Sequence, residues 1–311
     1  MSTRRNPLYT FWQPRHWPVW LALGIFRIIN LLPLPFQFWL GRRIGRLAYR
    51  FSSRRRHIAL RNIELCFPQL PAAEQHDLVR RHFEALGISL IEIGMGWWTS
   101  DEKLSRITRF EGAEHIEQAV AEKRSIIFLT GHFTTLEVSG RVLRHHSPPF
   151  DAVYRKNRSD FITELQRRSR ERSARRTIEK SDIKSMVRSL RERTPVWYAP
   201  DQNYRRKKAE WISFFGIPAM TNTATSTLAK LGDAVVLPFF PRRLEDDTYV
   251  LTVLPRLQDF PSDNDVVDTQ RFVAILEEQI RQCPEQYFWV HRRFKTQEGE
   301  PDPYERASAD S

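Results

Sequence analysis

The sequence contains only two cysteines, Cys66 and Cys283, and neither belongs to a C-x-x-C pair. This scarcity argues against a disulfide framework and a cysteine-based zinc site, so we expect two reduced and partly buried thiols. The G-x-S-x-G, P-loop, G-x-G-x-x-G and H-E-x-x-H motifs are also missing. Their absence argues against a serine-elbow hydrolase, a P-loop nucleotidase, a dinucleotide-binding enzyme and a zinc protease. No internal repeat or long low-complexity linker divides the 311 residues.

Acidic residues are the minority charge. The chain has 49 Lys and Arg against 37 Asp and Glu, which gives a net charge of +12. Such an excess indicates an anionic partner: nucleic acid, a phosphorylated small molecule or an acidic membrane surface. Nine tryptophans and 20 phenylalanines are many for a simple nucleic-acid binder. Aromatic residues combined with arginines suit a membrane–water boundary better.

Residues 17–40 form a mostly apolar tract. A helix of this length would cover roughly 36 Å, enough to span a bilayer with tilt. Polar and proline residues interrupt the tract, so a single span and a half-buried interfacial helix both fit. More arginines follow the tract than precede it, which places the chain after residue 41 in the cytosol. No small-residue cleavage site follows, so the tract is not read as a cleaved signal peptide. The interrupting residues are Arg27, Asn30, Pro33, Pro35 and Gln37.

The chain beyond residue 57 alternates between helical and strand patterns up to about residue 297. This alternation predicts an α/β domain whose mainly parallel sheet is flanked by helices. Residues 298–311 are polar and are expected to be a frayed tail. The expected helices cover 71–97, 112–123, 133–145, 159–193, 221–231 and 265–282, and the expected strands cover 125–130, 151–154, 195–199, 234–240, 248–254 and 286–293.

The segment "SIIFLTGHFTTLE" carries the pattern with the most chemistry. An apolar strand ends at Gly131 and His132, and Glu137 follows five residues after the histidine. Reactive groups gather at the carboxyl ends of strands in α/β sheets, and His132 lies at such an end. A carboxylate that bonds one imidazole nitrogen fixes the tautomer and makes the other nitrogen a general base for a hydroxyl. The spacing alone also fits a histidine with a purely structural role.

The same segment, "HFTTLE", matches the H-x-x-x-x-E motif and resembles the late acyltransferases of lipid A biosynthesis, within the lysophospholipid acyltransferase superfamily. Four further blocks resemble that family in the same order: "RNIELCFPQL" (61–70), "VYRKN" (153–157), "WYAPDQNY" (197–204) and "PEQYFWVHRRFKT" (284–296). The E-G-T-R block of glycerophosphate acyltransferases is missing, which favours the lipid A branch. The "CFPQL" and "APDQNY" blocks look closer to the lauroyl transferases than to the myristoyl enzymes.

The resemblance implies a glycerolipid acyltransferase-like fold over 57–297, preceded by a membrane-anchoring segment with a basic flank over 1–56. It implies transfer of a fatty acyl chain, laurate by the closer likeness, from acyl carrier protein to a 3-hydroxyacyl hydroxyl of Kdo2-lipid IVA. His132 would deprotonate that hydroxyl and Glu137 would orient His132. No cofactor, metal or covalent acyl-enzyme is implied. The implied location is the bacterial inner membrane, with the catalytic domain on the cytoplasmic side.

By the same resemblance, Arg155 would bind a phosphate or steady the oxyanion, and Asp201 is expected near Arg155 as its ion-pair partner. The arginine run 165–176, which includes Arg167 and Arg168, fits a solvated face, a surface for the carrier protein or a contact with lipid phosphates. Lipid phosphates are also the expected partners of the basic residues at the end of the last block, Arg292, Arg293 and Lys295.

Alternative functions stay open at this point. A later-acting myristoyl transferase or a phospholipid acyltransferase would use the same motif. A basic nucleic-acid-binding or membrane-binding protein without activity is a more distant alternative. It would leave the apolar tract and the His132–Glu137 spacing unexplained, and the sequence shows no recognition or stacking motif. We therefore expect membrane lipids, acyl carrier protein and a phosphorylated lipid A precursor as partners, and no nucleic acid.

Overall fold

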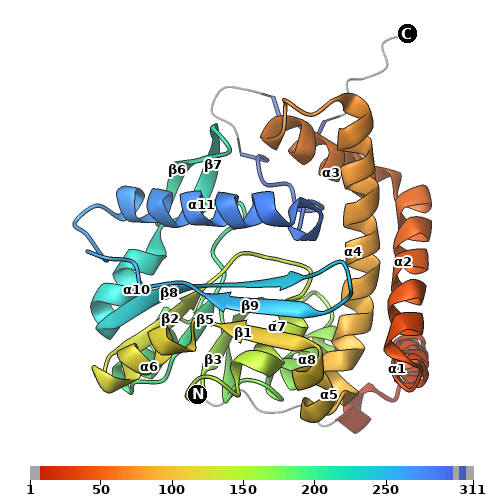
Figure 1. The fold of residues 1–311 in the computed structure, drawn as a ribbon, viewed down its shortest axis with the longest axis horizontal. Coiled ribbons are helices and arrows are strands. Elements are labelled where there is room, and N and C mark those ends of the chain that lie inside the picture. Colours follow the sequence, from red (N-terminus) through yellow and green to blue (C-terminus); the bar gives the residue numbers. More distant parts are fainter. Residues whose placement is uncertain (1–7, 297–300, 306–311) are drawn as a thin grey trace.

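A seven-stranded sheet forms the centre of the computed structural model, which describes residues 8–296 and 301–305 (Figure 1). Its strand order is β1-β9-β8-β2-β5-β3-β4. The strands β8, β2, β5, β3 and β4 run parallel to one another. Strand β9 is antiparallel to β8, and β1 is parallel to β9. The expected mainly parallel sheet is thus confirmed. The strands are β1 Thr108–Glu111, β2 Ser125–Leu129, β3 Asp151–Tyr154, β4 Arg176–Glu179, β5 Val196–Tyr198, β8 Ala234–Arg243 and β9 Tyr249–Val253.

Helices cover both faces of the sheet, which explains why β2 is apolar at four of five positions and buried throughout (Figure 1). Ile127 and Leu129 of β2 pack into one hydrophobic cluster with α9, α10 and α11. Ile126 and Phe128 pack into the other cluster with α6 and α7. The covering helices are α6 Ala113–Ala121, α7 Leu136–Leu143, α8 Asp160–Arg170, α9 Ile183–Arg191, α10 Ala224–Gly232 and α11 Asp265–Gln282.

The apolar N-terminal tract forms two helices, α1 (Trp17–Ile29) and α2 (Leu34–Phe51), rather than one. The break falls at residues 30–33, because Pro33 has no N–H to donate and disfavours the helical conformation of the residue before it. No helix within the described residues is both long enough and apolar enough to cross a bilayer. The predicted membrane-spanning helix over 17–40 is therefore not supported.

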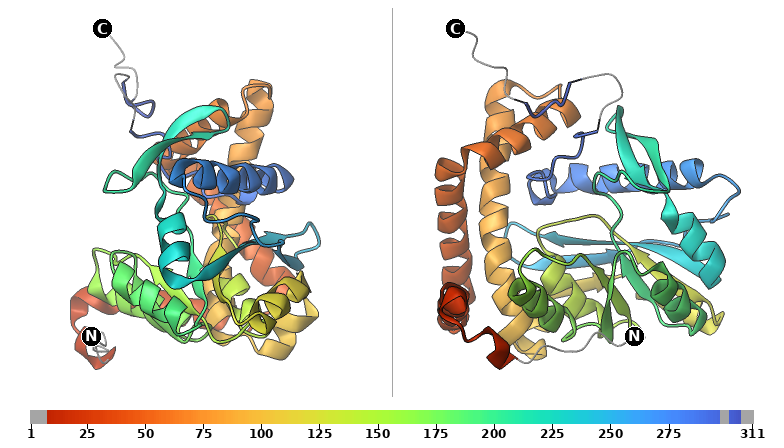
Figure 2. Two further views of the ribbon diagram at one scale, coloured as in Figure 1. Left: turned by 90° about the vertical axis from the view of Figure 1, so that its left-hand side faces the viewer. Right: turned by 180° about the vertical axis from the view of Figure 1, so that it is seen from behind.

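The N-terminal helices α1 and α2 lie beside α4 (Ala72–Trp98) at one end of the sheet, and α2 and α4 pack side by side (Figures 1 and 2). Glycines permit this close approach. A Cβ at Gly87 of α4 would lie 2.0 Å from the Gly41 carbonyl oxygen and 2.5 Å from the Gly45 nitrogen of α2. The remaining helices at this end are α3 (Ser53–Cys66) and α5 (Asp101–Arg106).

Two predicted elements differ from the structure. The region 159–193 is α8, β4 and α9 rather than continuous helix, because β4 pairs with β3 between them. Residues 286–293 form no strand; one bridge joins Tyr287 to Phe133. The hairpin of β6 (Ala209–Phe214) and β7 (Ile217–Asn222) was not predicted, and neither were the strand β1 and the helices α3 and α5. The expected frayed tail lies outside the described residues except for 301–305.

Candidate active site

A histidine and an aspartate meet at the carboxyl edge of the sheet. His132 follows β2 and Asp201 follows β5, and these neighbouring strands are paired in parallel with Leu129 opposite Tyr198. The Nδ1 atom of His132 lies 2.5 Å from Oδ1 of Asp201. The backbone N–H of His132 also donates to Oδ2 of Asp201, at 2.9 Å. Two contacts from one residue therefore fix both the position and the orientation of the imidazole.

Asp201 is held as an anion in a buried place. Burial alone would raise the pKa of this carboxyl, but the His132 imidazole, the two hydrogen bonds from His132 and the one from Tyr287 together lower the pKa to about 2. The Tyr287 hydroxyl donates at 2.9 Å to Oδ2. A carboxylate can only accept at Nδ1, so Nδ1 carries the proton of a neutral His132 ring. The unprotonated Nε2 is then available as a base, and the His132 side chain is 33 % exposed.

The C-terminal segment 284–294 closes over this pair. The Phe288 N–H donates to the His132 carbonyl oxygen at 2.9 Å. Asn62 of α3 holds the segment in place by donating to the carbonyl oxygens of Trp289 (2.6 Å) and His291 (2.7 Å). Side chains from α3, from the loops after β2 and β5 and from this segment line a small cavity that is too narrow to hold a water molecule: Asn62, His132, Asp201, Gln202, Tyr287, Phe288, Trp289, His291 and Arg293.

His291 is a second histidine in that cavity, and it is neutral. Burial lowers its pKa to about 4, against an opposing contribution from Asp201. Its Nε2 accepts a hydrogen bond of 3.1 Å from the Asn203 backbone N–H. Neither Tyr287 nor His291 was predicted as a site residue. The block "PEQYFWVHRRFKT" was the available signal, but it marked the segment without identifying which of its side chains turn inward.

Glu137 lies elsewhere than expected. The contact to the His132 ring that was assigned to Glu137 is made by Asp201. Glu137 instead accepts a hydrogen bond of 3.3 Å from Ser169 and lies 3.5 Å from Nε of Arg170, both on α8. The reason is that α7 begins only at Leu136, so Glu137 is in its first turn and faces α8 rather than the loop that carries His132.

Arg155 follows β3 at the same edge of the sheet and is exposed. The predicted ion pair between Arg155 and Asp201 is not formed, because the two oxygens of Asp201 are occupied by His132 and Tyr287. Arg155 nonetheless lies close enough to His291 to contribute to the lowering of its pKa. The structure thus brings His132, Asp201 and Arg155 to one region, with Asp201 in the position predicted for Glu137.

Most of the remaining predicted cations serve the fold. Arg167 is buried and pairs with Glu164 at 2.6 Å and Glu171 at 2.5 Å, and Arg168 pairs with Glu164 at 2.6 Å. The run 165–176 is therefore largely paired within the protein rather than a free basic surface.

The cations of the last block divide in the same way. Arg293 is buried and donates to Thr221 (2.5 Å) and to the Met220 carbonyl oxygen (3.0 Å). Arg292 is paired with Asp302, and Lys295 is exposed. Of the three, Lys295 is thus the exposed cation, and the contact of these residues with lipid phosphates stays a prediction.

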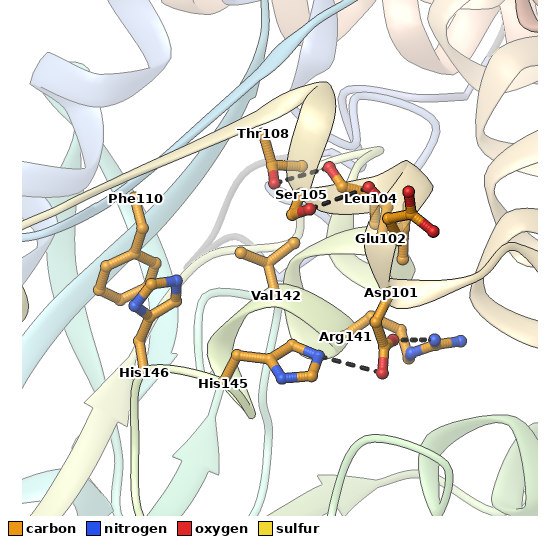
Figure 3. Close-up of a pocket in the computed structure, with 10 residues that line it drawn as sticks. All are labelled: Asp101, Glu102, Leu104, Ser105, Thr108, Phe110, Arg141, Val142, His145 and His146. Atoms are coloured by element: carbon orange, nitrogen blue, oxygen red, sulfur yellow. Dashed lines mark hydrogen bonds and ion pairs between the residues drawn. The ribbon is translucent and has the colours of Figure 1, made fainter.

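A larger cavity of about 490 Å³ lies between α5, β1 and α7 (Figure 3). Its polar wall is built by Asp101, Arg141 and His145, and the His146 ring stacks on Phe110 with 4.0 Å between centroids (Figure 3). Arg141 donates to the carbonyl oxygens of Gly96 and Thr99 at the end of α4, so it anchors that helix. None of the reactive candidates lines this cavity, and size alone does not identify the active site.

Comparison with known proteins identifies the family of the chain. The family model for bacterial lipid A biosynthesis acyltransferases matches residues 8–296. The chain belongs to this family. It is 38 % identical over 294 residues to the lipid A biosynthesis lauroyltransferase of Escherichia coli, covering 94 % of this chain and 96 % of that protein. It is 34 % identical to the palmitoleoyltransferase (92 % and 94 % covered) and 28 % identical to the myristoyltransferase (96 % and 93 % covered) of the same organism.

Membership in the lipid A acyltransferase family confirms the resemblance inferred from the sequence blocks. The match spans both the sheet and the N-terminal helices, so no part of the described fold apart from 301–305 is left unmatched. The relatives differ in the acyl chain that their names specify: lauroyl, palmitoleoyl and myristoyl. The family thus determines the class of reaction but leaves the chain length to be argued separately.

Proposed function

We propose that this lipid A acyltransferase transfers a lauroyl chain from acyl carrier protein to a 3-hydroxyacyl hydroxyl of Kdo2-lipid IVA. The observation that carries the proposal is the His132–Asp201 pair at the carboxyl edge of the sheet, with its 2.5 Å contact. The 38 % identity to a lauroyltransferase favours laurate, whereas the 34 % and 28 % identities support the palmitoleoyl and myristoyl alternatives less strongly.

In the proposed reaction, Nε2 of His132 removes the proton from the acceptor hydroxyl as its oxygen attacks the thioester carbonyl. The new C–O ester bond forms, the C–S bond breaks, and the carrier's thiolate leaves and takes the proton from the imidazolium. Asp201 stabilises the positive charge on the ring during this step and keeps the proton on Nδ1. General-base assistance of this kind contributes about 10²–10⁴-fold to a rate.

Glu137 has a different role in this proposal from the one predicted. Its contacts with Ser169 and Arg170 hold the first turn of α7 against α8. Because α7 starts four residues after His132, a shift of its first turn would displace the loop that carries the base. Glu137 is accordingly a positioning residue rather than the partner of the imidazole.

The N-terminal helices support a membrane location. Helices α1 and α2 expose large apolar side chains to solvent, which is the pattern of a helix that lies in the membrane–water interface. We propose that these helices rest on the bacterial inner membrane and that the catalytic domain lies on the cytoplasmic side, where the lipid acceptor meets the carrier protein. The exposed residues are Trp17, Leu21, Ile25, Ile28, Phe36 and Trp39.

The test is product analysis with purified protein. Kdo2-lipid IVA is incubated with lauroyl, palmitoleoyl and myristoyl thioesters of acyl carrier protein, and the lipid is examined by mass spectrometry. The proposal predicts one added lauroyl group and slower use of the other chains. Preferred transfer of another chain would overturn the lauroyl assignment, and no transfer from any carrier-protein thioester would overturn the proposed donor.

A further inference from the structure

Three cations lie in segments that follow β3, β4 and β5 at the carboxyl edge of the sheet, the edge at which the proposed catalytic base follows β2. Arg155 and Lys180 directly follow the paired strands β3 and β4, whose last register pair is Tyr154 and Glu179. The Lys180 N–H donates to the Tyr154 carbonyl oxygen at 2.8 Å, so the parallel pairing continues to this point. Both basic side chains therefore leave the sheet together, at the edge where His132 follows β2.

Arg206 completes the group from the segment after Asp201. Burial and the charges of Arg155 and Arg206 lower the pKa of Lys180, and Glu179 acts weakly in the opposite direction. Arg155 and Arg206 are thus each close enough to repel the charge of Lys180. Such an arrangement is unfavourable by itself and becomes favourable when an anion binds between the cations.

These cations lack the partners that their neighbours have. Arg167, Arg170 and Arg176 are paired with Glu164, Glu137 and Asp151 respectively. Within residues 8–296, by contrast, no carboxylate forms an ion pair with Arg155, Lys180 or Arg206. The arginines of α8 and β4 are thus paired with carboxylates, whereas the charges of Arg155, Lys180 and Arg206 are not neutralised by an ion pair within residues 8–296.

The position of the group indicates where its anion comes from. The loop that begins with Arg155 leads into α8, and Phe161 at the start of α8 stacks on Phe11 (4.7 Å between centroids) and contacts Trp20 (5.2 Å). The loop that begins with Arg155 therefore leads to the apolar N-terminal helix α1. A phosphate on a lipid whose chains lie in the membrane would reach this edge of the sheet with its head group.

We propose that Arg155, Lys180 and Arg206 bind a phosphate monoester on the lipid acceptor and hold its sugar head group beside His132. The inference rests on the proposed function and adds Lys180 and Arg206 to it. A phosphate monoester carries up to two negative charges and three acceptor oxygens, which matches a group of three donors.

The experiment compares Lys180→Ala and Arg206→Ala with Lys230→Ala, a control at an exposed lysine on α10. Kinetics are measured with a phosphorylated lipid A precursor and with the same lipid after phosphatase treatment. We expect KM for the phosphorylated acceptor to rise about 10- to 100-fold in each test variant. KM for the acyl donor, kcat and the melting temperature should stay near the wild-type values, and the control should change none of them.

Three results would overturn the inference. The first is a rise in KM for the donor alone, which would assign the cations to the carrier's phosphopantetheine phosphate. The second is an equal rise for the phosphorylated and dephosphorylated acceptors, and the third is no rise at all. Binding of the phosphorylated lipid in detergent micelles without donor is measured in parallel. Loss of that binding in the test variants would support the inference even if the acyl-transfer assay refuted the proposed donor.

Discussion

Replacing Asp201 by asparagine perturbs one proton and little else. The side chain keeps its shape, and an amide oxygen can still accept from the His132 backbone N–H and the Tyr287 hydroxyl, which now lie at 2.9 Å. The amide nitrogen then faces Nδ1 of His132 in place of the oxygen at 2.5 Å. Because that nitrogen is a donor, Nδ1 must accept, and the proton moves to Nε2. The ring can no longer remove a proton from the acceptor hydroxyl.

The expected loss follows from this tautomer change. General-base catalysis is worth about 10²–10⁴-fold, so kcat of Asp201→Asn should fall by about that factor, or about 3–5 kcal/mol in activation free energy. KM for both substrates should change by less than about threefold, because the cavity wall is preserved. The assay is initial-rate acyl transfer from carrier-protein thioester to Kdo2-lipid IVA.

Glu137→Gln is the matched comparison, because it makes the same chemical change on the residue that sequence analysis paired with His132. Its contacts are with Ser169 and Arg170, so we expect a smaller fall in kcat, about tenfold. Asp201→Asn with nearly full kcat would refute the reasoning. A much larger loss in Glu137→Gln than in Asp201→Asn would do the same and return the bracing role to Glu137.

Three further predictions concern stability and reactivity. Gly87→Ala should destabilise the fold by about 1–3 kcal/mol or more in urea unfolding, since its Cβ would lie 2.0 Å from the Gly41 carbonyl oxygen. Gly24→Ala is the control and should be neutral or stabilising, because a Cβ at Gly24 would have nothing within 4 Å. Equal effects of the two substitutions would refute the close approach of α2 and α4. Burial lowers the pKa of His82 to about 4, so its neutral form stabilises the fold above pH 6.5, and this contribution is lost as pH falls towards 4. Relative to His82→Gln, the unfolding free energy of the wild type should fall by up to about 1.4 kcal/mol per pH unit between pH 6.5 and 4. A difference between the two proteins that does not change with pH would contradict a buried neutral ring. Burial raises the pKa values of Cys66 and Cys283, the latter to about 12, so a thiol reagent at pH 8 should label both only after unfolding, and rapid labelling of the native protein would contradict their burial.

Local pattern was sufficient to predict much of the fold. The bounds of α11 and β3 agree with the predicted ranges 265–282 and 151–154, because each is a continuous periodic or apolar segment between clear boundaries. The strand that ends before His132 was found for the same reason. The short strand β4 was missed, since four residues between basic helical segments carry no period of their own and become a strand only by pairing with β3.

The partner of His132 could not be read from neighbouring residues. Five positions separate His132 from Glu137, and nearness in sequence suggested nearness in space. Asp201 is 69 positions away and arrives at the ring only because β2 and β5 are adjacent in the sheet. Likewise, Glu164 just before the arginine run and Glu171 within it appear in the sequence, but their pairing with Arg167 depends on which helix face is buried.

The central claim is that His132 acts as the base of a lipid A acyl transfer. The most direct measurement is single-turnover transfer from carrier-protein thioester to Kdo2-lipid IVA by His132→Ala, with circular dichroism and thermal melting to establish that the variant is folded. We expect a folded protein whose rate of ester formation falls by at least about 10²-fold while its affinity for the lipid is retained. A folded His132→Ala variant that forms the ester at nearly the wild-type rate would contradict this claim.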